Sequence, residues 1–266
     1  MNKYNSIYFL LFILLVMGAF ASMAQNNYGL NIIGGVAFVF SLLFIAEFIA
    51  VLRNKEKNDP FNLIEPVCLA TISFIFGLRV FYIHFNYVEL LFGAAALMLV
   101  SVYLRKMNLR YRHFQPQNSL LANLVLVFHM SIILFLISLA LFPFTAYTAE
   151  YFGIGSFGLL LIFIITGILN KKLMVAGENI PAFAIVEKFK DHSIIIVSVI
   201  IMFSFYFGFN KIGVLPGIYS DEYPRAYFEL VDEATKGKEK AVDGKDKSKL
   251  FMEKYQQFLE HNKIIN

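Results

Sequence analysis

Apolar residues fall into seven long runs along the chain, separated by short polar stretches. A helix needs about 20 apolar residues to cross the ~30 Å hydrocarbon layer of a bilayer. Because each run is long enough or nearly so, the pattern predicts an all-α, polytopic transmembrane helical bundle. The predicted spans are residues 7–24, 31–52, 62–82, 87–104, 120–143, 152–170 and 193–213.

The first six spans predict three helical hairpins, each closed by a short turn, with a single helix after them. In the first hairpin Gly18 and Gly34 are sixteen residues apart, and Gly77 and Gly93 repeat that separation in the second. Glycines near the turns are expected to let the two helices of a hairpin approach closely. The repeated spacing fits either an internal duplication or the need of any antiparallel hairpin for small residues.

Composition agrees with a membrane protein, since 58% of the residues are hydrophobic and only 16% are charged. A soluble domain is closer to half apolar and a quarter charged. The net charge is +4, and the Lys and Arg residues gather in alternate short stretches, 53–61, 105–118 and 171–192. Basic loops stay on the cytoplasmic side of a membrane. We therefore expect a cytoplasmic N-terminus and an external C-terminus, and no nucleic-acid partner.

The first apolar run has a second interpretation. "FLLFILLVMGAFASMAQ" also resembles the apolar core of a signal peptide, with a small-residue cleavage site after Ala24. The basic region before it contains only Lys3, which favours a retained helix. Cleavage would leave six spans and an external N-terminus.

After residue 213 the composition becomes strongly charged, which predicts a transmembrane domain over 1–213 and a separate tail over 214–266. Apolar residues recur at helical spacing in two tail segments and predict a small extracytoplasmic helical hairpin. A hairpin of this size cannot bury a core of its own. Residues 220–262 are therefore expected to dock on the bundle or on other subunits. On the cytoplasmic side, residues 181–192 predict an interfacial helix.

Ionisable side chains at membrane depth are candidates for function, because each costs ~2.5–3.5 kcal/mol to insert. The candidates for an ion or proton path, or for structural ion pairs, are Glu47, Glu65, Arg79, His84, Glu89 and His129. Arg79 and Glu89 flank a turn, so they are expected to form an ion pair that closes the second hairpin. The alternative is an outer gate of an ion or proton path, in which His84 changes charge near neutral pH.

The other candidates lie deeper. Glu47 and Glu65 are at similar depth on consecutive helices, and Glu65 shares one face of its helix with Arg79. They fit either a charge-relay path or side chains that reach toward Arg53 and the interface. His129, near the middle of its helix, fits a neutral histidine hydrogen-bonded between helices or a proton carrier.

Searches for catalytic patterns find no zinc-protease motif, nucleophile elbow, P-loop, Rossmann glycines or paired Cys and His spacing. We therefore predict no cofactor and no metal. The leading hypothesis is a non-enzymatic inner-membrane subunit of a bacterial envelope complex for secretion or motility. The alternative is a proton- or ion-coupled small-solute transporter or channel. A third hypothesis is a lipid-modifying enzyme that uses Arg79, His84 and Glu89 at an interface.

The first hairpin, "VMGAFASMAQNNYGLNIIGGVAFVFSLLFIAEFIAVL", carries a resemblance. Three features carry the resemblance: a Gly-Ala near the end of the first helix, a glycine early in the second, and a glutamate followed by Ile and Leu. This hairpin resembles the two-helix membrane region of GldL-type proteins of the gliding-motility and type IX secretion motor. The resemblance implies a role coupled to proton motive force, and with it an ion-coupled role for Glu47.

Overall fold

The computed structural model describes residues 5–23, 27–53, 60–81, 83, 85, 87–142, 144–170, 173–175, 178–180, 189 and 191–211. His84 and the predicted tail over 214–266 lie outside the described residues. Most of the predicted interfacial helix, residues 181–188, also lies outside them. Predictions about these segments stay predictions.

Helices make up nearly all of the described chain. They are α1 (Asn5–Met23), α2 (Asn27–Arg53), α3 (Pro60–Val80), α4 (Val88–Phe114), α5 (Ser119–Leu141), α6 (Ala146–Leu169) and α8 (Ser193–Lys211). The predicted all-helical architecture is confirmed, and each helix overlaps one predicted span. A short antiparallel hairpin between α6 and α8, β1 (Leu173–Val175) and β2 (Glu178–Ile180), was not predicted.

Two boundaries were predicted wrongly, since α6 begins at Ala146 and not at residue 152, and the larger error is at the end of α4. α4 continues to Phe114, so residues 105–114 are helical and not part of a loop. Lys, Arg, Met and Leu are strong helix formers, which lets the helix continue after the apolar run ends. Because of this extension, basic side chains of α4 lie against the other helices.

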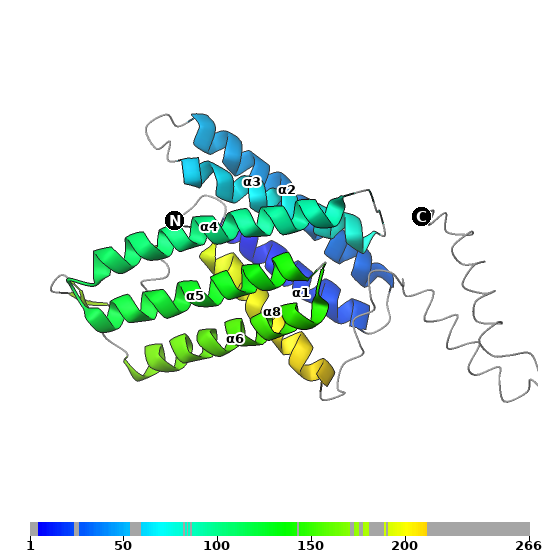
Figure 1. Cartoon of the computed structure of the whole chain (residues 1–266). Coiled ribbons are helices and arrows are strands. Elements are labelled where there is room, and N and C mark those ends of the chain that lie inside the picture. The colour runs from blue at the N-terminus through cyan, green and yellow to red at the C-terminus, as the bar shows by residue number, and fades with distance from the viewer. Residues whose placement is uncertain are drawn as a thin grey trace, which may run out of the picture. The chain divides into compact units, whose positions relative to one another are not determined.

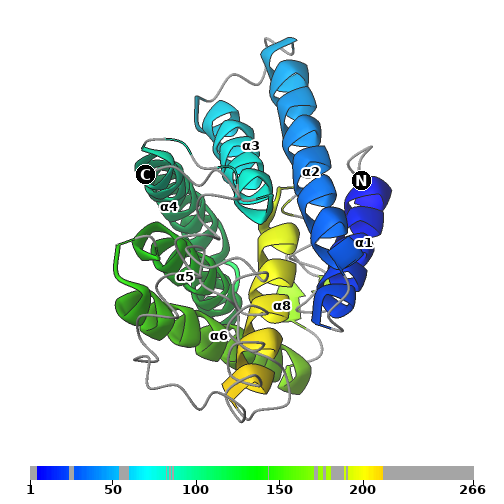
Figure 2. The same cartoon turned by 90° about the vertical axis from the view of Figure 1, so that its right-hand side faces the viewer.

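The helices pack in sequence order, each of α1 to α5 against the next, and α8 packs against α5 and α6. Figure 1 shows this order, and Figure 2 shows α8 between α1 and α2 on one side and α4, α5 and α6 on the other. One buried cluster runs through the bundle, with Phe44 of α2, Tyr103 of α4 and Ile200 of α8 among its members. Ile196 and Ile200 thus anchor one side of α8 in the core of the bundle.

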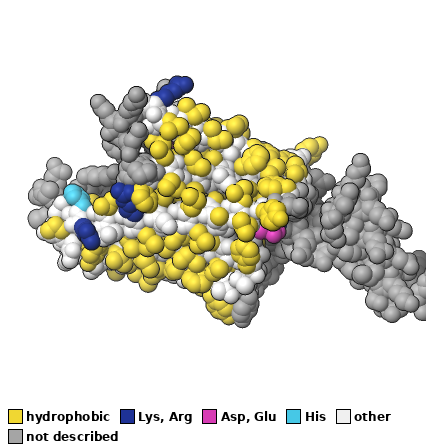
Figure 3. All heavy atoms as spheres, turned by 45° about the horizontal axis from the view of Figure 1, so that its top comes forward, with side chains coloured by type: hydrophobic (Ala, Val, Ile, Leu, Met, Phe, Trp, Pro, Cys, Tyr) yellow, Lys and Arg dark blue, Asp and Glu magenta, His cyan; other side chains and the backbone are white. Residues whose placement is uncertain are grey.

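Among the described residues, five helices are long and apolar enough to cross a membrane. These segments are Tyr28–Arg53, Leu63–Val80, Val88–Phe114, Ser119–Leu141 and Thr148–Leu169, while the apolar segments Ile7–Ala21 and Ser193–Phe205 are shorter. On the face drawn in Figure 3, hydrophobic side chains cover the middle, and Lys and Arg lie toward one end. These features indicate a multi-pass membrane protein, and the count of seven spans stays a prediction.

Hydrogen bonds link neighbouring helices inside the bundle. The Ser41 hydroxyl of α2 donates to the Ala70 carbonyl of α3 at 3.0 Å. The Ser156 hydroxyl of α6 donates to the Ser131 carbonyl of α5 at 2.7 Å. Such bonds stabilise helix packing in lipid, because the hydrophobic effect does not drive helices together there.

The glycines do not all act as expected. Gly18 of α1 lies against Ile32 and Ile33 of α2, as the hairpin prediction requires. Gly77 of α3 instead packs on the Phe38 ring of α2, and Gly93 of α4 packs near the Ala140 carbonyl of α5. The expected close approach within the second hairpin is therefore wrong, because both glycines face other neighbours.

Candidate functional site

A set of buried and partly buried polar side chains lies at the basic end of the bundle, where α2 and α4 end and α3, α5 and α8 begin. We call this set the polar network. Its members are Glu47 of α2, Glu65 of α3, Tyr103, Lys106 and Arg110 of α4, His129 of α5, and Asp191 and His192 just before α8. Sequence reasoning named only Glu47, Glu65 and His129 among them.

His192 lies between two carboxylates. Its Nε2 is 2.5 Å from Oε2 of Glu47, and its Nδ1 is 3.5 Å from Oε1 of Glu65. Burial alone would lower the pKa of His192, but its hydrogen bond with Glu47 and its ion pair with Glu65 outweigh burial and raise the pKa to about 9. The ring is therefore a cation at neutral pH, held by helices α2 and α3.

Aromatic rings enclose this histidine on its other sides. Phe44 of α2 and Tyr8 of α1 meet the His192 ring edge-on, with centroids 5.2 and 6.2 Å away. Tyr8 also stacks on Phe44 and Phe40 of α2. Because Phe40, Phe44 and Glu47 recur at helical spacing, α2 presents its aromatic rings and its carboxylate on one face.

Glu65 is the most buried carboxylate of the network, with only 5% of its surface exposed. The Tyr103 hydroxyl donates to its Oε1 at 2.8 Å, and Lys106 Nζ donates to its Oε2 at 2.6 Å. A buried carboxylate is tolerated when it is paired and hydrogen-bonded in this way. The predicted alternative, in which Glu47 and Glu65 reach toward Arg53 and the interface, is wrong because both side chains turn inward to His192.

Asp191 performs two roles. It accepts hydrogen bonds from Lys106 at 3.2 Å and Arg110 at 2.7 Å, and its Oδ1 accepts from the Ser193 backbone N–H at 3.1 Å. The last bond caps the start of α8, where a negative charge is favourable. Burial alone would raise the pKa of Asp191, but the charges of Lys106 and Arg110 outweigh it and lower the pKa.

Arg110 connects the network to α5. Its Nη1 is 2.7 Å from Nε2 of His129, and its guanidinium lies 3.9 Å from the centre of the Phe189 ring. A guanidinium only donates hydrogen bonds, so Nε2 of His129 must accept. His129 Nδ1 then donates to the Val125 carbonyl at 2.7 Å. The geometry fixes a neutral imidazole bonded between two helices, one of the two predicted alternatives.

The residues that sequence reasoning missed share a readable signal. Tyr103, Lys106 and Arg110 recur at a spacing of three and four, which places them on one face of a helix that continues past residue 104. Asp191 and His192 immediately precede an apolar run, where an acidic residue is a normal helix cap. Sequence spacing does not show which distant residues these side chains meet.

The polar network is balanced in charge. Its three carboxylates, Glu47, Glu65 and Asp191, face three basic groups, Lys106, Arg110 and His192. In a buried pair, removal of one partner leaves an uncompensated charge, which destabilises a protein strongly. Within the described part of the chain, no three His, Cys, Asp or Glu side chains are grouped to hold a metal ion. The arrangement is built to fasten helices together.

The remaining predicted residues lie elsewhere. Arg79 Nη2 is 2.7 Å from Oε1 of Glu89, so the expected ion pair is present at the turn between α3 and α4. Glu89 is about 21 Å along α4 from Tyr103, given a 1.5 Å rise per residue. The Arg79–Glu89 pair is therefore about four helical turns from Tyr103 of the polar network, and the charge-relay path from Glu65 to Arg79 stays a prediction.

Comparisons with protein-family models, with characterised proteins and with solved structures find no match for this chain. The resemblance of the first hairpin to GldL-type proteins therefore stays a prediction.

Proposed function

We propose that this chain is a non-enzymatic integral subunit of a membrane complex, whose helical bundle is a rigid platform for the segment that follows α8. The bundle lies in the inner membrane of a bacterium, with the N-terminus in the cytoplasm and the C-terminus in the periplasm. Residues 220–262 bind the other subunits of a secretion or motility assembly. One observation carries the proposal: the polar network ties the start of α8 to the rest of the bundle.

The network supports a platform because of what it connects. Asp191 and His192 lie at the first residues of α8, and their partners come from α2, α3 and α4. Arg110 extends the connection to His129 of α5. Since α8 is followed directly by the charged tail, fixing α8 fixes the root of the segment proposed to bind partners.

The charge state of the network also favours a platform over a proton path. A group that gives and takes a proton during each cycle works best with a pKa near the operating pH. The pKa of His192 is about 9, so this ring stays protonated at neutral pH. His129 is held as a neutral acceptor by the guanidinium of Arg110. Both histidines are fixed in one protonation state.

A second candidate, a proton- or ion-coupled transporter, has one observation in its favour. His192 bridges carboxylates of two helices, and among the described residues its Nδ1 has no hydrogen-bond partner, although Glu65 is within ion-pair distance. Loss of the His192 proton would weaken the link between α8 and the α2–α3 pair. Such a proton-dependent link is an element that a transporter needs for alternating access.

Purification from native membranes in mild detergent tests the platform proposal. The wild-type chain is expected to elute with stoichiometric partner proteins. In the first predicted tail helix the apolar stripe is Tyr227, Leu230, Val231 and Ala234. Leu230→Asp, which places a charge in this stripe, should release these partners. Lys236→Asp, on the opposite side of the same predicted helix, is the matched control and should keep them. A wild-type chain that always purifies alone would end the proposal.

Flux measurements separate the two candidates. In membrane vesicles, the transporter requires that Glu47→Gln abolish proton-dependent uptake while the protein still inserts. The platform requires that Glu47→Gln lower stability and leave uptake of small solutes unchanged. These two results exclude each other.

A further inference from the structure

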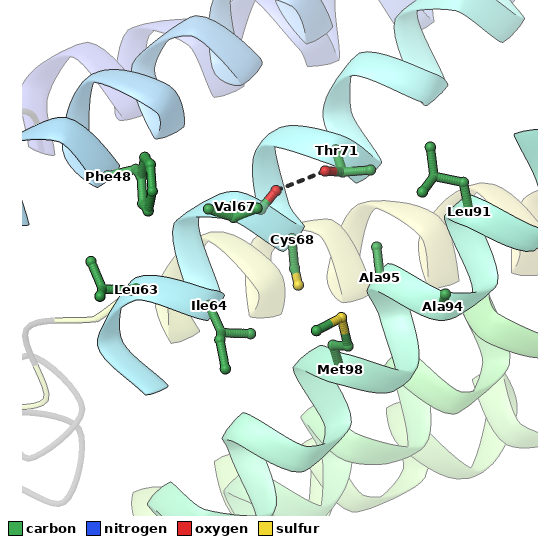
Figure 4. A pocket seen from close by; sticks show the side chains of 10 residues that line it. All are labelled: Phe48, Leu63, Ile64, Val67, Cys68, Thr71, Leu91, Ala94, Ala95 and Met98. Atoms are coloured by element: carbon green, nitrogen blue, oxygen red, sulfur yellow. Dashed lines mark hydrogen bonds between the residues drawn. The ribbon is translucent and has the colours of Figure 1, made fainter. Parts of the chain in front are cut away.

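A cleft of about 350 Å³ lies between α3 and α4, with Phe48 of α2 also in its lining. Figure 4 shows the thiol of Cys68 pointing from α3 toward Met98 and Ala95 of α4. Ala94 is exposed and lines the same cleft. Two small residues on α4 therefore leave a hollow that longer side chains would fill.

The lining of the cleft is apolar. Its polar side chain Thr71 donates its hydroxyl to the Val67 carbonyl of its own helix at 2.9 Å, as the dashed line in Figure 4 shows. Both walls belong to helices that are long and apolar enough to span a bilayer. The cleft therefore suits a hydrocarbon chain and offers no partner to a polar solute.

A cationic group lies in line with the cleft. Leu91, Met98 and Arg105 are seven residues apart on α4, so they share one face of the helix. Arg105 is thus two turns beyond the cleft, toward the basic end. Its guanidinium lies 4.1 Å from the centre of the Phe61 ring of α3. The same pair of helices that forms the cleft therefore holds this arginine at its end.

Distances along α4 match one leaflet of a membrane. Arg105 is about 10 Å beyond Met98 and about 21 Å beyond Leu91, given a rise of 1.5 Å per residue. Half of the hydrocarbon layer is about 15 Å thick, and the phosphates lie just outside it. A lipid whose phosphate meets Arg105 would therefore extend its acyl chain along the cleft. Arginine is well suited to this phosphate, since its guanidinium makes paired, charge-assisted hydrogen bonds.

We propose that the cleft between α3 and α4 binds one acyl chain of an anionic glycerophospholipid, with the lipid phosphate held by Arg105. This site is independent of the platform role. It adds a specific lipid to the partners of the bundle, on the side of the membrane where the polar network lies.

Native mass spectrometry tests the site directly. The full chain is reconstituted in vesicles of equimolar phosphatidylglycerol and phosphatidylcholine and then extracted in mild detergent. We expect one retained phosphatidylglycerol per chain, preferred at least fivefold over phosphatidylcholine. Ala94→Leu fills the cleft and should reduce retention at least fivefold. Ala46→Leu makes the same change at an exposed alanine of α2 and should retain the lipid like the wild type.

Arg105→Gln provides a second readout that does not alter the cleft. It should remove the preference for phosphatidylglycerol while an acyl chain is still retained. Equal retention by Ala94→Leu and Ala46→Leu would overturn the site. So would a wild type without headgroup preference, or an Arg105→Gln variant that keeps its preference. If Ala94→Leu does not fold, the Arg105→Gln result alone decides whether the lipid site exists.

Discussion

Glu47 and His192 are 145 residues apart in the chain, yet Oε2 of one lies 2.5 Å from Nε2 of the other. This contact joins the end of α2 to the start of α8. α8, the last helix among the described residues, is thereby held by a helix near the start of the chain.

Arg110→Met should be among the most destabilising single changes in the bundle. It leaves Asp191 with a weaker set of partners and His129 without its donor, and breaking a buried ionic network typically costs about 3–5 kcal/mol. Arg112→Met, two positions along on the exposed side of α4, should cost less than about 1 kcal/mol. The free energy of unfolding in mild detergent measures both. Equal losses for the two variants would mean that Arg110 contributes no more than a surface charge.

Stability should fall as the pH rises above neutral. The pKa of His192 is about 9 in the folded protein against an ordinary value of 6.5. The protonated ring therefore stabilises the fold fully below pH 6.5, and this contribution is lost as the pH rises through 9. The full effect is about 3 kcal/mol. Thermal unfolding between pH 6 and 9.5 should show this decline in the wild type and a flatter curve in His192→Gln. Parallel curves would assign the pH dependence to other groups.

Neighbouring glycines of α2 should respond differently to alanine. A Cβ added at Gly34 would overlap the Phe81 ring, which stacks on Phe38, whereas a Cβ at Gly35 meets nothing within 4 Å. Gly34→Ala should therefore lower stability by about 1–3 kcal/mol through overpacking. Gly35→Ala should be neutral or slightly stabilising, because alanine favours helix over glycine. Thermal unfolding of the two variants checks this, and an equal response would contradict the close packing of α2 against the end of α3.

Reporter fusions should fix the orientation. The Lys and Arg distribution predicts that a phosphatase, active only outside the cytoplasm, is inactive when fused after residue 116 and active when fused after residue 211. A cytoplasmic reporter should give the opposite pattern. Phosphatase activity at residue 116 would invert the topology and place the polar network at the outer face.

The helices were largely predictable from sequence because lipid imposes a simple rule on them. Long apolar runs must become helices, and α2, α3, α5 and α8 begin and end close to the predicted limits. The contact between Arg79 and Glu89 was also predictable, since a short turn brings both to one depth. The local sequence was sufficient to predict these helix limits and this ion pair.

The polar network was only partly predictable because its contacts are long-range. Glu47 and Glu65 were recognised as costly groups in the membrane, but their partner His192 lies far away in the chain. Lys106 and Arg110 were assigned to a basic loop, since the apolar run ends before them while the helix does not. Their inward direction depends on how α4 and α8 pack, which the pattern along one chain does not encode.

A double-mutant cycle between Glu47 and His192 tests the central claim most directly. The free energy of unfolding is measured in mild detergent at pH 6.5 for the wild type, Glu47→Gln, His192→Gln and the double variant. If the two residues hold α8 on the bundle, the losses should be non-additive, with a coupling of about 1–3 kcal/mol. Additivity to within about 0.5 kcal/mol would show that the contact does not anchor the last helix.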